Sequence, residues 1–248
     1  MDEVSRKTFL LFGDSLTQRS FDEGGWGGRL ASAYQRKADV IARGYSGYNT
    51  RWAAYTLEKI FTKGHVPPDL VTIFFGANDA ALPDRLNGRQ HVPIEEYVAH
   101  LRAFVEHIRS VGTKHIILIT PPPVDETVRV QENQQKVGGE QEAAMLPERT
   151  NAVAGEYAKA VKQLGEELGI PVVDLWSNIQ MQPLWQACLS DGLHFTSTGN
   201  AAVYHLVQAK INEALPHLRP DALSMDFPGH ADIDASSPDS AFKGTAIS

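Results

Sequence analysis

Short apolar runs alternate along this chain with segments of helical periodicity, and this alternation constrains the fold more than any other feature of the sequence. Most of the runs are continuous and rich in β-branched or aromatic residues, as is typical of strands that are covered on both faces. They predict strands at Thr8–Phe12, Val40–Ala42, Leu70–Phe75, His115–Thr120 and Pro171–Leu175.

The segments between these runs have apolar residues spaced near 3.6 positions apart, which predicts helices. In residues 94–111, for example, this spacing places Tyr97, Leu101 and Phe104 on one face. Alternating strands and helices indicate a parallel sheet built from right-handed crossovers. We therefore expect an α/β fold, a three-layer α/β/α sandwich around a five-stranded parallel sheet. The predicted helices span residues 26–37, 51–61, 94–111, 150–168 and 198–215.

Two segments interrupt this rhythm. Residues 124–147 are polar and rich in Gln and Glu, and they predict a long surface excursion, either with a helical turn or as a mobile loop without a role. From about Asp221 onward the chain is mostly Ser, Asp, Ala, Pro and Gly without periodicity, which predicts a flexible tail. We expect a main domain over residues 1–218 and a C-terminal tail over residues 219–248.

Composition excludes several classes of protein. The 248 residues are 42% apolar and 21% charged, as in ordinary globular proteins. The net charge of −7 argues against a nucleic-acid partner, because phosphate would be repelled. The single cysteine, Cys188, rules out an intrachain disulfide. The N-terminal apolar run is too short for a signal peptide, and no stretch approaches the ~20 apolar residues that span a bilayer. We expect a cytoplasmic protein with no membrane span.

The sequence offers no pattern for a metal or a cofactor. His91, His100, His107 and His115 lack a metal-ligand spacing, and a polar stripe on a helix explains His100 and His107 more simply. No glycine-rich phosphate-binding loop with a following lysine is present, which argues against nucleotide use. We expect neither a metal nor a cofactor.

Four polar segments follow predicted strands, and all are expected at the same edge of the sheet, where open α/β sheets bind ligands. They are Gly13-Asp14-Ser15-Leu16-Thr17, Gly44-Tyr45-Ser46-Gly47-Tyr48-Asn49-Thr50, Gly76-Ala77-Asn78-Asp79 and Asp191-Gly192-Leu193-His194. A serine, a glycine N–H, an asparagine amide and an Asp/His pair are the groups that acyl transfer requires. The pattern indicates nucleophilic catalysis by a serine.

These segments resemble the ordered blocks of the SGNH/GDSL hydrolase superfamily, over roughly residues 8–215. Gly13-Asp14-Ser15-Leu16 resembles the nucleophile block and Ser46-Gly47 the glycine block. Gly76-Ala77-Asn78-Asp79 resembles the Gly-x-Asn-Asp block, and Asp191-Gly192-Leu193-His194 the Asp-x-x-His block. The resemblance implies a flavodoxin-like three-layer fold and a carboxylic ester hydrolase.

Three further segments resemble the isoamyl acetate-hydrolysing esterase subgroup. They are Gly24-Gly25-Trp26-Gly27, Arg43–Trp52 and Thr120–Glu126. This resemblance implies a small-molecule ester substrate, such as an acetate of a medium-length alcohol. The stretch around Gln131–Glu142 and the tail do not match the pattern, so substrate access and a possible homodimer stay open.

The resemblance also implies a role for each matched residue. Ser15 attacks the ester carbonyl, His194 takes its proton and returns it to the leaving alkoxide, and Asp191 orients His194. The oxyanion hole consists of the backbone N–H of Ser15, the N–H of Gly47 and the side-chain amide of Asn78. Since neutral His194 is the base, the rate is expected to rise with pH as histidine loses its proton. The residues that bind the rest of the substrate stay unknown.

Several neighbouring residues invite a competing interpretation. Asp14 and Asp79 are expected to brace their loops through hydrogen bonds to the backbone rather than to take part in chemistry. Ser46 is a second candidate nucleophile, but Tyr48 stands where a Gly-x-Ser-x-Gly elbow needs its last glycine. Trp52 is either a core residue at a helix start or part of the lining of an acyl or alcohol pocket.

Other functions stay open at this point. A thioesterase, a lysophospholipase or a carbohydrate O-acetylesterase would use the same catalytic groups, since specificity lies in the loops. A flavodoxin-like module that binds a ligand without turnover is the alternative outside the enzymes, although such a module has no need of a base beside a serine.

Overall fold

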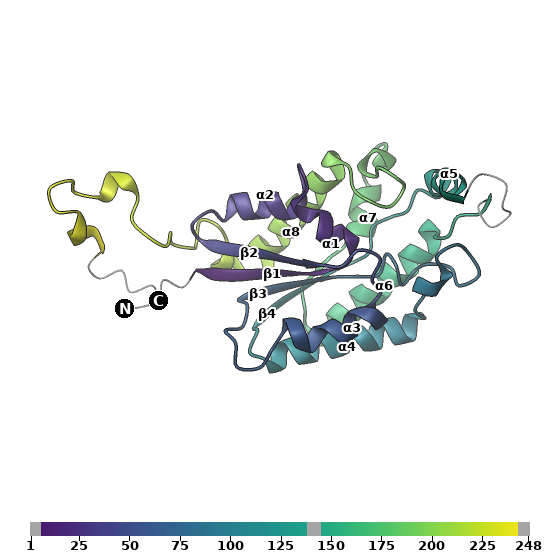
Figure 1. The fold of residues 1–248 in the computed structure, drawn as a ribbon, viewed down its shortest axis with the longest axis horizontal. Helices are drawn as coiled ribbons and strands as arrows, with labels where there is room; N and C mark the ends of the chain where they lie inside the picture. The colour runs from purple at the N-terminus through teal and green to yellow at the C-terminus, as the bar shows by residue number, and fades with distance from the viewer. Residues whose placement is uncertain (1–5, 138–144, 243–248) are drawn as a thin grey trace.

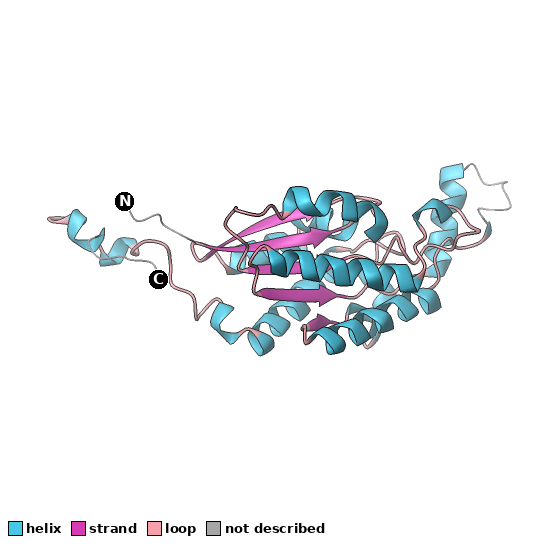
Figure 2. Cartoon of the chain, turned by 90° about the horizontal axis from the view of Figure 1, so that it is seen from below, coloured by secondary structure: helices cyan, strands magenta, loops and turns pink. Residues whose placement is uncertain are grey.

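The computed structural model describes residues 6–137 and 145–242. Its sheet has five parallel strands in the order β2-β1-β3-β4-β5, and the strand arrows point the same way in Figure 2. This is the flavodoxin-like order, so the predicted fold class is confirmed. The strands are β1 (Lys7–Gly13), β2 (Ala38–Gly44), β3 (Leu70–Phe74), β4 (His115–Ile119) and β5 (Val172–Val173).

Helices cover both faces of the sheet (Figure 1). Along β1, Phe9 and Leu11 point into one apolar core while Leu10 and Phe12 point into the other, as the alternation of a strand requires. The first core is closed by α2 (Trp26–Ala33), α7 (Leu175–Gln180) and α8 (Ser197–Ala214). The second core is closed by α3 (Thr50–Ile60), α4 (Ile94–Ser110) and α6 (Asn151–Leu168).

The structure adds short helices that periodicity did not predict. Two α-helices, α1 (Ser15–Gln18) and α7, are only one or two turns long, too short for an apolar repeat to be visible. Short 3₁₀-helices lie at η1 (Arg19–Phe21), η2 (Gly88–Gln90), η4 (Trp185–Cys188), η5 (Pro216–Leu218), η6 (His230–Asp232) and η7 (Pro238–Phe242).

The expectation for residues 124–147 needs correction. Its first half forms a three-turn helix, α5 (Glu126–Val137), rather than a single turn or a loop without a role. The side chains of Arg129 and Asn133 on this helix are buried, and Arg129 contacts Asp191. Buried polar side chains give the helix the low hydropathy of a surface segment. Residues 138–144 of the predicted excursion lie outside the described residues.

The polar segments predicted at the sheet edge converge at the point where the order of the strands in the sheet reverses. Strand β1 lies between β2 and β3, so the loops after β1 and β3 separate and leave room at the carboxyl ends. Gly44 is the last residue of β2 and packs against α1, and a Cβ there would lie 2.0 Å from the backbone nitrogen of Gln18. A glycine at this position therefore lets the helix that begins with Ser15 sit directly on the sheet.

The C-terminal segment leaves the fold at the opposite end of the sheet (Figure 1). It is attached there by Asp226, whose buried carboxylate forms ion pairs with Arg6 and Arg36. Arg36 also donates to the carbonyl of Phe227 over 2.6 Å. The boundary between a main domain and a tail at residue 218 stays a prediction. No helix within residues 6–137 and 145–242 has the length and hydropathy needed to cross a membrane.

Candidate active site

Ser15 stands at the first turn after β1, as expected. Asp14 caps α1, because its Oδ1 accepts a hydrogen bond from the backbone N–H of Leu16 over 2.9 Å. The backbone N–H of Asp14 donates to the carbonyl of Phe74 on β3 over 3.3 Å. These bonds fix the turn between β1 and α1 against the end of β3, and Ser15 is only 5% exposed within it.

Asp191 and His194 lie on one tight turn that faces Ser15. Oδ1 of Asp191 accepts from the backbone N–H of Leu193 at 3.1 Å and of His194 at 2.8 Å. Its Oδ2 lies 2.8 Å from Nδ1 of His194, and Nε2 of His194 lies 2.9 Å from Oγ of Ser15. The structure thus brings together three predicted residues that are up to 179 positions apart, in the order carboxylate, imidazole, hydroxyl that a nucleophile–base–orienter arrangement requires.

The surroundings of Asp191 keep its carboxyl ionised. Burial acts to raise the pKa of Asp191, but hydrogen bonds from His194 and the charge of Arg129 outweigh it and lower the pKa well below the usual value. Nη1 of Arg129 lies 3.3 Å from Oδ2 of Asp191 and donates to its backbone carbonyl over 2.9 Å. A carboxylate at this place can hold a proton on Nδ1 of His194 and stabilise the imidazolium.

The loops of Gly47 and Asn78 meet at the same edge. The side-chain amide of Asn78 donates to the carbonyl of Tyr48 over 2.8 Å, which connects the loop after β3 to the loop after β2. An amide nitrogen has two N–H donors, so one remains after this bond. Gly47 has a φ of +78°, a conformation that favours glycine.

Asp14 and Asp79 brace their loops, as predicted. Oδ1 of Asp79 accepts from the backbone N–H of Thr50 at 2.9 Å and from its hydroxyl at 2.5 Å. Both carboxyls are 0% exposed, and burial raises the pKa of Asp14 to about 7 and that of Asp79 to about 6. In each, Oδ2 has no hydrogen-bond partner within the described part of the chain, so no bond to this oxygen offsets the cost of burying the charged form.

Ser46, the competing candidate, lies in a different setting. Its backbone N–H donates to Oε1 of Gln18 over 2.8 Å, and within residues 6–137 and 145–242 its hydroxyl has no histidine partner. Of the two serines, Ser15 is therefore the one placed beside a base.

Two hollows border these residues. A small one of about 120 Å³ is lined by Ser15 and His194 with Leu16, Arg19 and Phe195 among others. The larger one, of about 680 Å³, starts at Gly47 and extends over the outer face of α3 without including Ser15. The hollow that contains the reactive groups is the smaller one, so volume alone does not locate the site.

Trp52 lines the larger hollow together with Tyr48 and Tyr55, and the guanidinium of Arg89 lies 5.2 Å from the centre of its ring. Its side chain is half-buried at the start of α3 rather than enclosed in the core. Trp52 is therefore not a core residue, but the hollow that it lines does not include Ser15. That it lines an acyl or alcohol pocket stays a prediction.

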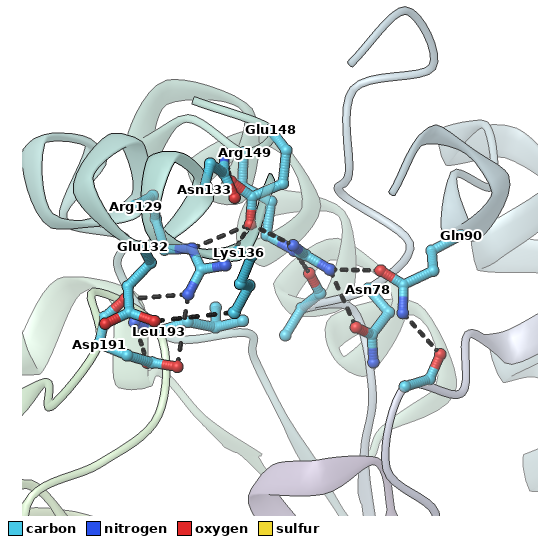
Figure 3. A network of polar contacts seen from close by, with 12 residues as sticks. Asn78, Gln90, Arg129, Glu132, Asn133, Lys136, Glu148, Arg149, Asp191 and Leu193 are labelled. Carbon is cyan, nitrogen blue, oxygen red and sulfur yellow. Dashed lines mark hydrogen bonds and ion pairs between the residues drawn. The ribbon is translucent and has the colours of Figure 1, made fainter. Parts of the chain in front are cut away.

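Sequence reasoning missed a buried polar network behind the site (Figure 3). Arg129, Glu148 and Arg149 are each at most 3% exposed, and they contact Asp191 on one side and Asn78 on the other. The only signal was the Glu148-Arg149 pair just after Pro147, which looks like any charged surface pair. Within the described residues, no group of three or more His, Cys, Asp or Glu side chains is arranged to hold a metal ion.

The chain is similar in sequence to several known proteins. The model of the family described as GDSL-like Lipase/Acylhydrolase matches residues 9–207. The GDSL esterase/lipase At5g62930 of Arabidopsis thaliana is 50% identical over 241 residues, which cover 96% of this chain and 98% of that protein. The isoamyl acetate-hydrolyzing esterase 1 homolog of Bos taurus is 46% identical over 220 residues, 85% of each chain.

Among solved structures, the lipase/acylhydrolase of Enterococcus faecalis superposes with a TM-score of 0.63 at 26% identity, covering 88% of this chain and 98% of that one. The family match covers most of the chain and includes every segment that forms the site. The chain belongs to the GDSL-like lipase/acylhydrolase family and is a carboxylic ester hydrolase.

Proposed function

We propose that the chain hydrolyses esters through an acyl-enzyme on Ser15. The observation that carries the proposal is the continuous chain of hydrogen bonds from Asp191 through His194 to Ser15, with steps of 2.8 and 2.9 Å. His194 takes the hydroxyl proton as Ser15 Oγ bonds to the ester carbonyl carbon, and it gives that proton to the leaving alkoxide. Water, activated by the same imidazole, then attacks the acyl-enzyme and releases the carboxylic acid and Ser15.

The negative charge of the tetrahedral intermediate needs donors. In the proposal these are the backbone N–H of Ser15, the backbone N–H of Gly47 and the remaining N–H of the Asn78 amide. The bond from Asn78 to the Tyr48 carbonyl supports this set, because it holds the two loops together at the carboxyl edge. Donors that are fixed before the reaction stabilise the transition state without reorganising.

For the substrate we propose small to medium carboxylic esters of the acetate type. The hollow beside Ser15 is about 120 Å³, small beside the ~300–1,000 Å³ of typical ligand pockets. The similarity to the isoamyl acetate-hydrolyzing esterase 1 homolog supports the same substrate class. Thioesters, lysophospholipids and acetylated carbohydrates are the alternatives, and family membership disfavours a binding module without turnover.

A chain-length series tests both parts of the proposal. Hydrolysis of p-nitrophenyl esters from acetate to decanoate is measured for the wild type and for Ser15→Ala, with an acyl-coenzyme A and an acetylated sugar as further substrates. We expect the wild type to hydrolyse the acetate and butyrate esters and Ser15→Ala to lose this activity. A preference for decanoate, the thioester or the sugar would reassign the substrate, and equal rates for the two proteins would refute the role of Ser15.

A further inference from the structure

Three buried charged residues lie between the turn of Asp191 and His194 and the loops of Asn78 and Gly47. We call these the two halves of the site. We call Arg129, Glu148 and Arg149 the arginine–glutamate cluster (Figure 3). Arg129 comes from α5, and the other two directly precede α6. Glu148 is 0% exposed and each arginine 3%. Charges buried to this degree are costly unless each is paired and hydrogen-bonded, so the arrangement calls for a specific role.

Glu148 joins the two arginines. Its Oε1 accepts from Nη2 of Arg129 at 2.6 Å and from Nη1 of Arg149 at 2.7 Å, while its Oε2 accepts from the amide of Asn133 at 2.8 Å. Burial acts to raise the pKa of Glu148, but the charges of Arg149 and Arg129 outweigh it and lower the pKa, so the carboxyl stays ionised.

Arg129 extends the cluster to Asp191. One guanidinium nitrogen, Nη1, donates to the backbone carbonyl of Asp191 and lies 3.3 Å from its Oδ2. The other guanidinium nitrogens, Nε and Nη2, are held by Glu148 at 2.9 and 2.6 Å. The position of Asp191 therefore depends on Glu148 through one rigid planar group.

Arg149 extends the cluster to the other half of the site. Its Nη2 donates to Oδ1 of Asn78 at 3.0 Å and to Oε1 of Gln90 at 2.7 Å, and its Nε donates to the carbonyl of Ala77 at 2.7 Å. A guanidinium can only donate, so both amides must turn their oxygen toward it and their nitrogen away. Arg149 thus fixes Asn78 with its N–H groups facing the Gly47 loop.

The same bonds hold the Gly47 loop. The nitrogen of the Gln90 amide donates to the carbonyl of Gly47 at 2.9 Å, and that of Asn78 donates to the carbonyl of Tyr48 at 2.8 Å. Two successive carbonyls of this loop are therefore bound to amides whose orientation Arg149 determines.

We propose that the arginine–glutamate cluster positions the reacting groups, with Arg149 holding Asn78 as a donor, Arg129 holding Asp191, and Glu148 linking the two halves. This inference rests on the proposed function, because it assumes that Asn78 and Asp191 serve the reaction at Ser15. The cluster residues are positioning residues and do not contact the ester.

A double-mutant cycle between Arg149 and Asn78 tests the proposal. Arg149→Lys keeps the charge opposite Glu148 but loses the planar fork. We expect it to lower kcat on p-nitrophenyl acetate about 10²-fold with KM unchanged. In an Asn78→Ala chain the same change should lower kcat by less than about 10-fold, because the amide that Arg149 orients is gone. An equal factor in both chains would overturn the proposal, since a purely structural residue acts alike in both.

Two further variants separate positioning from folding. Gln90→Ala removes an uncharged, half-buried side chain, so the variant should fold even if Arg149→Lys does not; we expect kcat to fall about 10-fold with KM and Tm unchanged. Wild-type kcat in this variant would overturn the proposal. Arg36→Lys, the matched control, disturbs the ion pair with Asp226 at the opposite end of the sheet and should leave kcat unchanged.

The proposed function is checked in the same experiment. Ser15→Ala must abolish the activity for the cycle to report on the reaction. If wild-type activity survives Ser15→Ala, the proposed function fails. If Ser15→Ala abolishes the activity, and the loss of kcat in the Arg149→Lys, Asn78→Ala double variant is the product of the losses in the two single variants, only the role of the cluster fails.

Discussion

Replacing Asp191 with asparagine probes the hydrogen bonds that orient the histidine. Both backbone N–H groups, of Leu193 and His194, donate to Oδ1 of Asp191, so an asparagine must place its oxygen there. Its NH₂ group then occupies the place of Oδ2, 2.8 Å from Nδ1 of His194. Nδ1 of His194 must then accept a hydrogen bond from this NH₂ group, so the ring proton moves to Nε2, opposite the hydroxyl of Ser15. His194 is left without a lone pair on Nε2 to take the serine proton.

The expected loss is large because the wrong tautomer blocks the base, and the ion pair between Arg129 and Oδ2 of Asp191 is lost as well. We expect kcat on p-nitrophenyl acetate to fall about 10⁴-fold, equivalent to about 5.5 kcal/mol of transition-state stabilisation. Asp174→Asn is the matched control, because Asp174 also accepts from a backbone N–H, that of Ser177, but caps α7 away from Ser15. It should change kcat less than about 3-fold, because Asp174 follows β5, which lies three strands from β1 in the sheet.

Stopped-flow or steady-state release of p-nitrophenol measures both variants, with circular dichroism and Tm as checks that each is folded. A folded Asp191→Asn variant that keeps kcat within about tenfold of wild type would refute the orienting role, because one wrong tautomer suffices to block the base.

Three further predictions rest on separate parts of the structure. Asn78→Ala should lower kcat about 10²–10³-fold while circular dichroism stays native; a change below threefold would remove the amide from the oxyanion hole. The raised pKa of Asp14, about 7, means that the folded state binds a proton the unfolded chain releases above its usual pKa of 3.8, so this group makes stability fall as pH rises from about 4 to about 7. The Tm of Asp14→Asn minus the Tm of the wild type should therefore be larger at pH 8 than at pH 5; an equal Tm difference at both pH values would contradict this. Gly44→Ala places a Cβ 2.0 Å from the nitrogen of Gln18 and should destabilise by at least about 2 kcal/mol. Gly28→Ala, with nothing within 4 Å, should stabilise by about 0.5–1 kcal/mol in urea unfolding; similar effects of the two changes would refute the packing of α1 on β2.

Most of the sheet could be predicted from sequence because β1, β3 and β4 are largely buried apolar runs, whereas the edge strand β2 is only partly buried. In β3, for instance, every residue from Leu70 to Phe74 is buried, and a short continuous run of this kind is typical of a strand covered on both faces. Apart from the short α7, the helices that cover the sheet were predicted to within a few residues because each buries one apolar face against it. In α2 the prediction ran on to Lys37, whereas the helix ends at Ala33 before a turn in which Arg36 has a φ of +63°.

The site was predicted only in part, and the missing part is polar. Ser15 directly follows β1, as predicted, whereas α7 and η4 separate β5 from Asp191 and His194. The motifs and their resemblance to a family, more than the topology, predicted that these three residues meet. Arg129 and Glu148 could not, because a buried ion pair and an exposed one have the same residue types and spacing. Burial of α5 depends on partners 19 and 62 residues away, and no periodicity records such contacts.

Placement of Trp52 illustrates the same limit. Its aromatic side chain fits a core and a pocket equally well in sequence, and only the three-dimensional arrangement of Tyr48, Tyr55 and Arg89 around it shows that it lines a surface hollow rather than the core.

The most direct test of the account is covalent labelling of the nucleophile. The full chain is treated with a fluorophosphonate probe, and the modified peptide is identified by mass spectrometry in the wild type, in His194→Ala and in Ser46→Ala. We predict one label on Ser15 in the wild type and in Ser46→Ala, and a large loss of labelling in His194→Ala. A label on Ser46, or no label on a folded and esterase-active chain, would contradict the claim that Ser15 is the nucleophile.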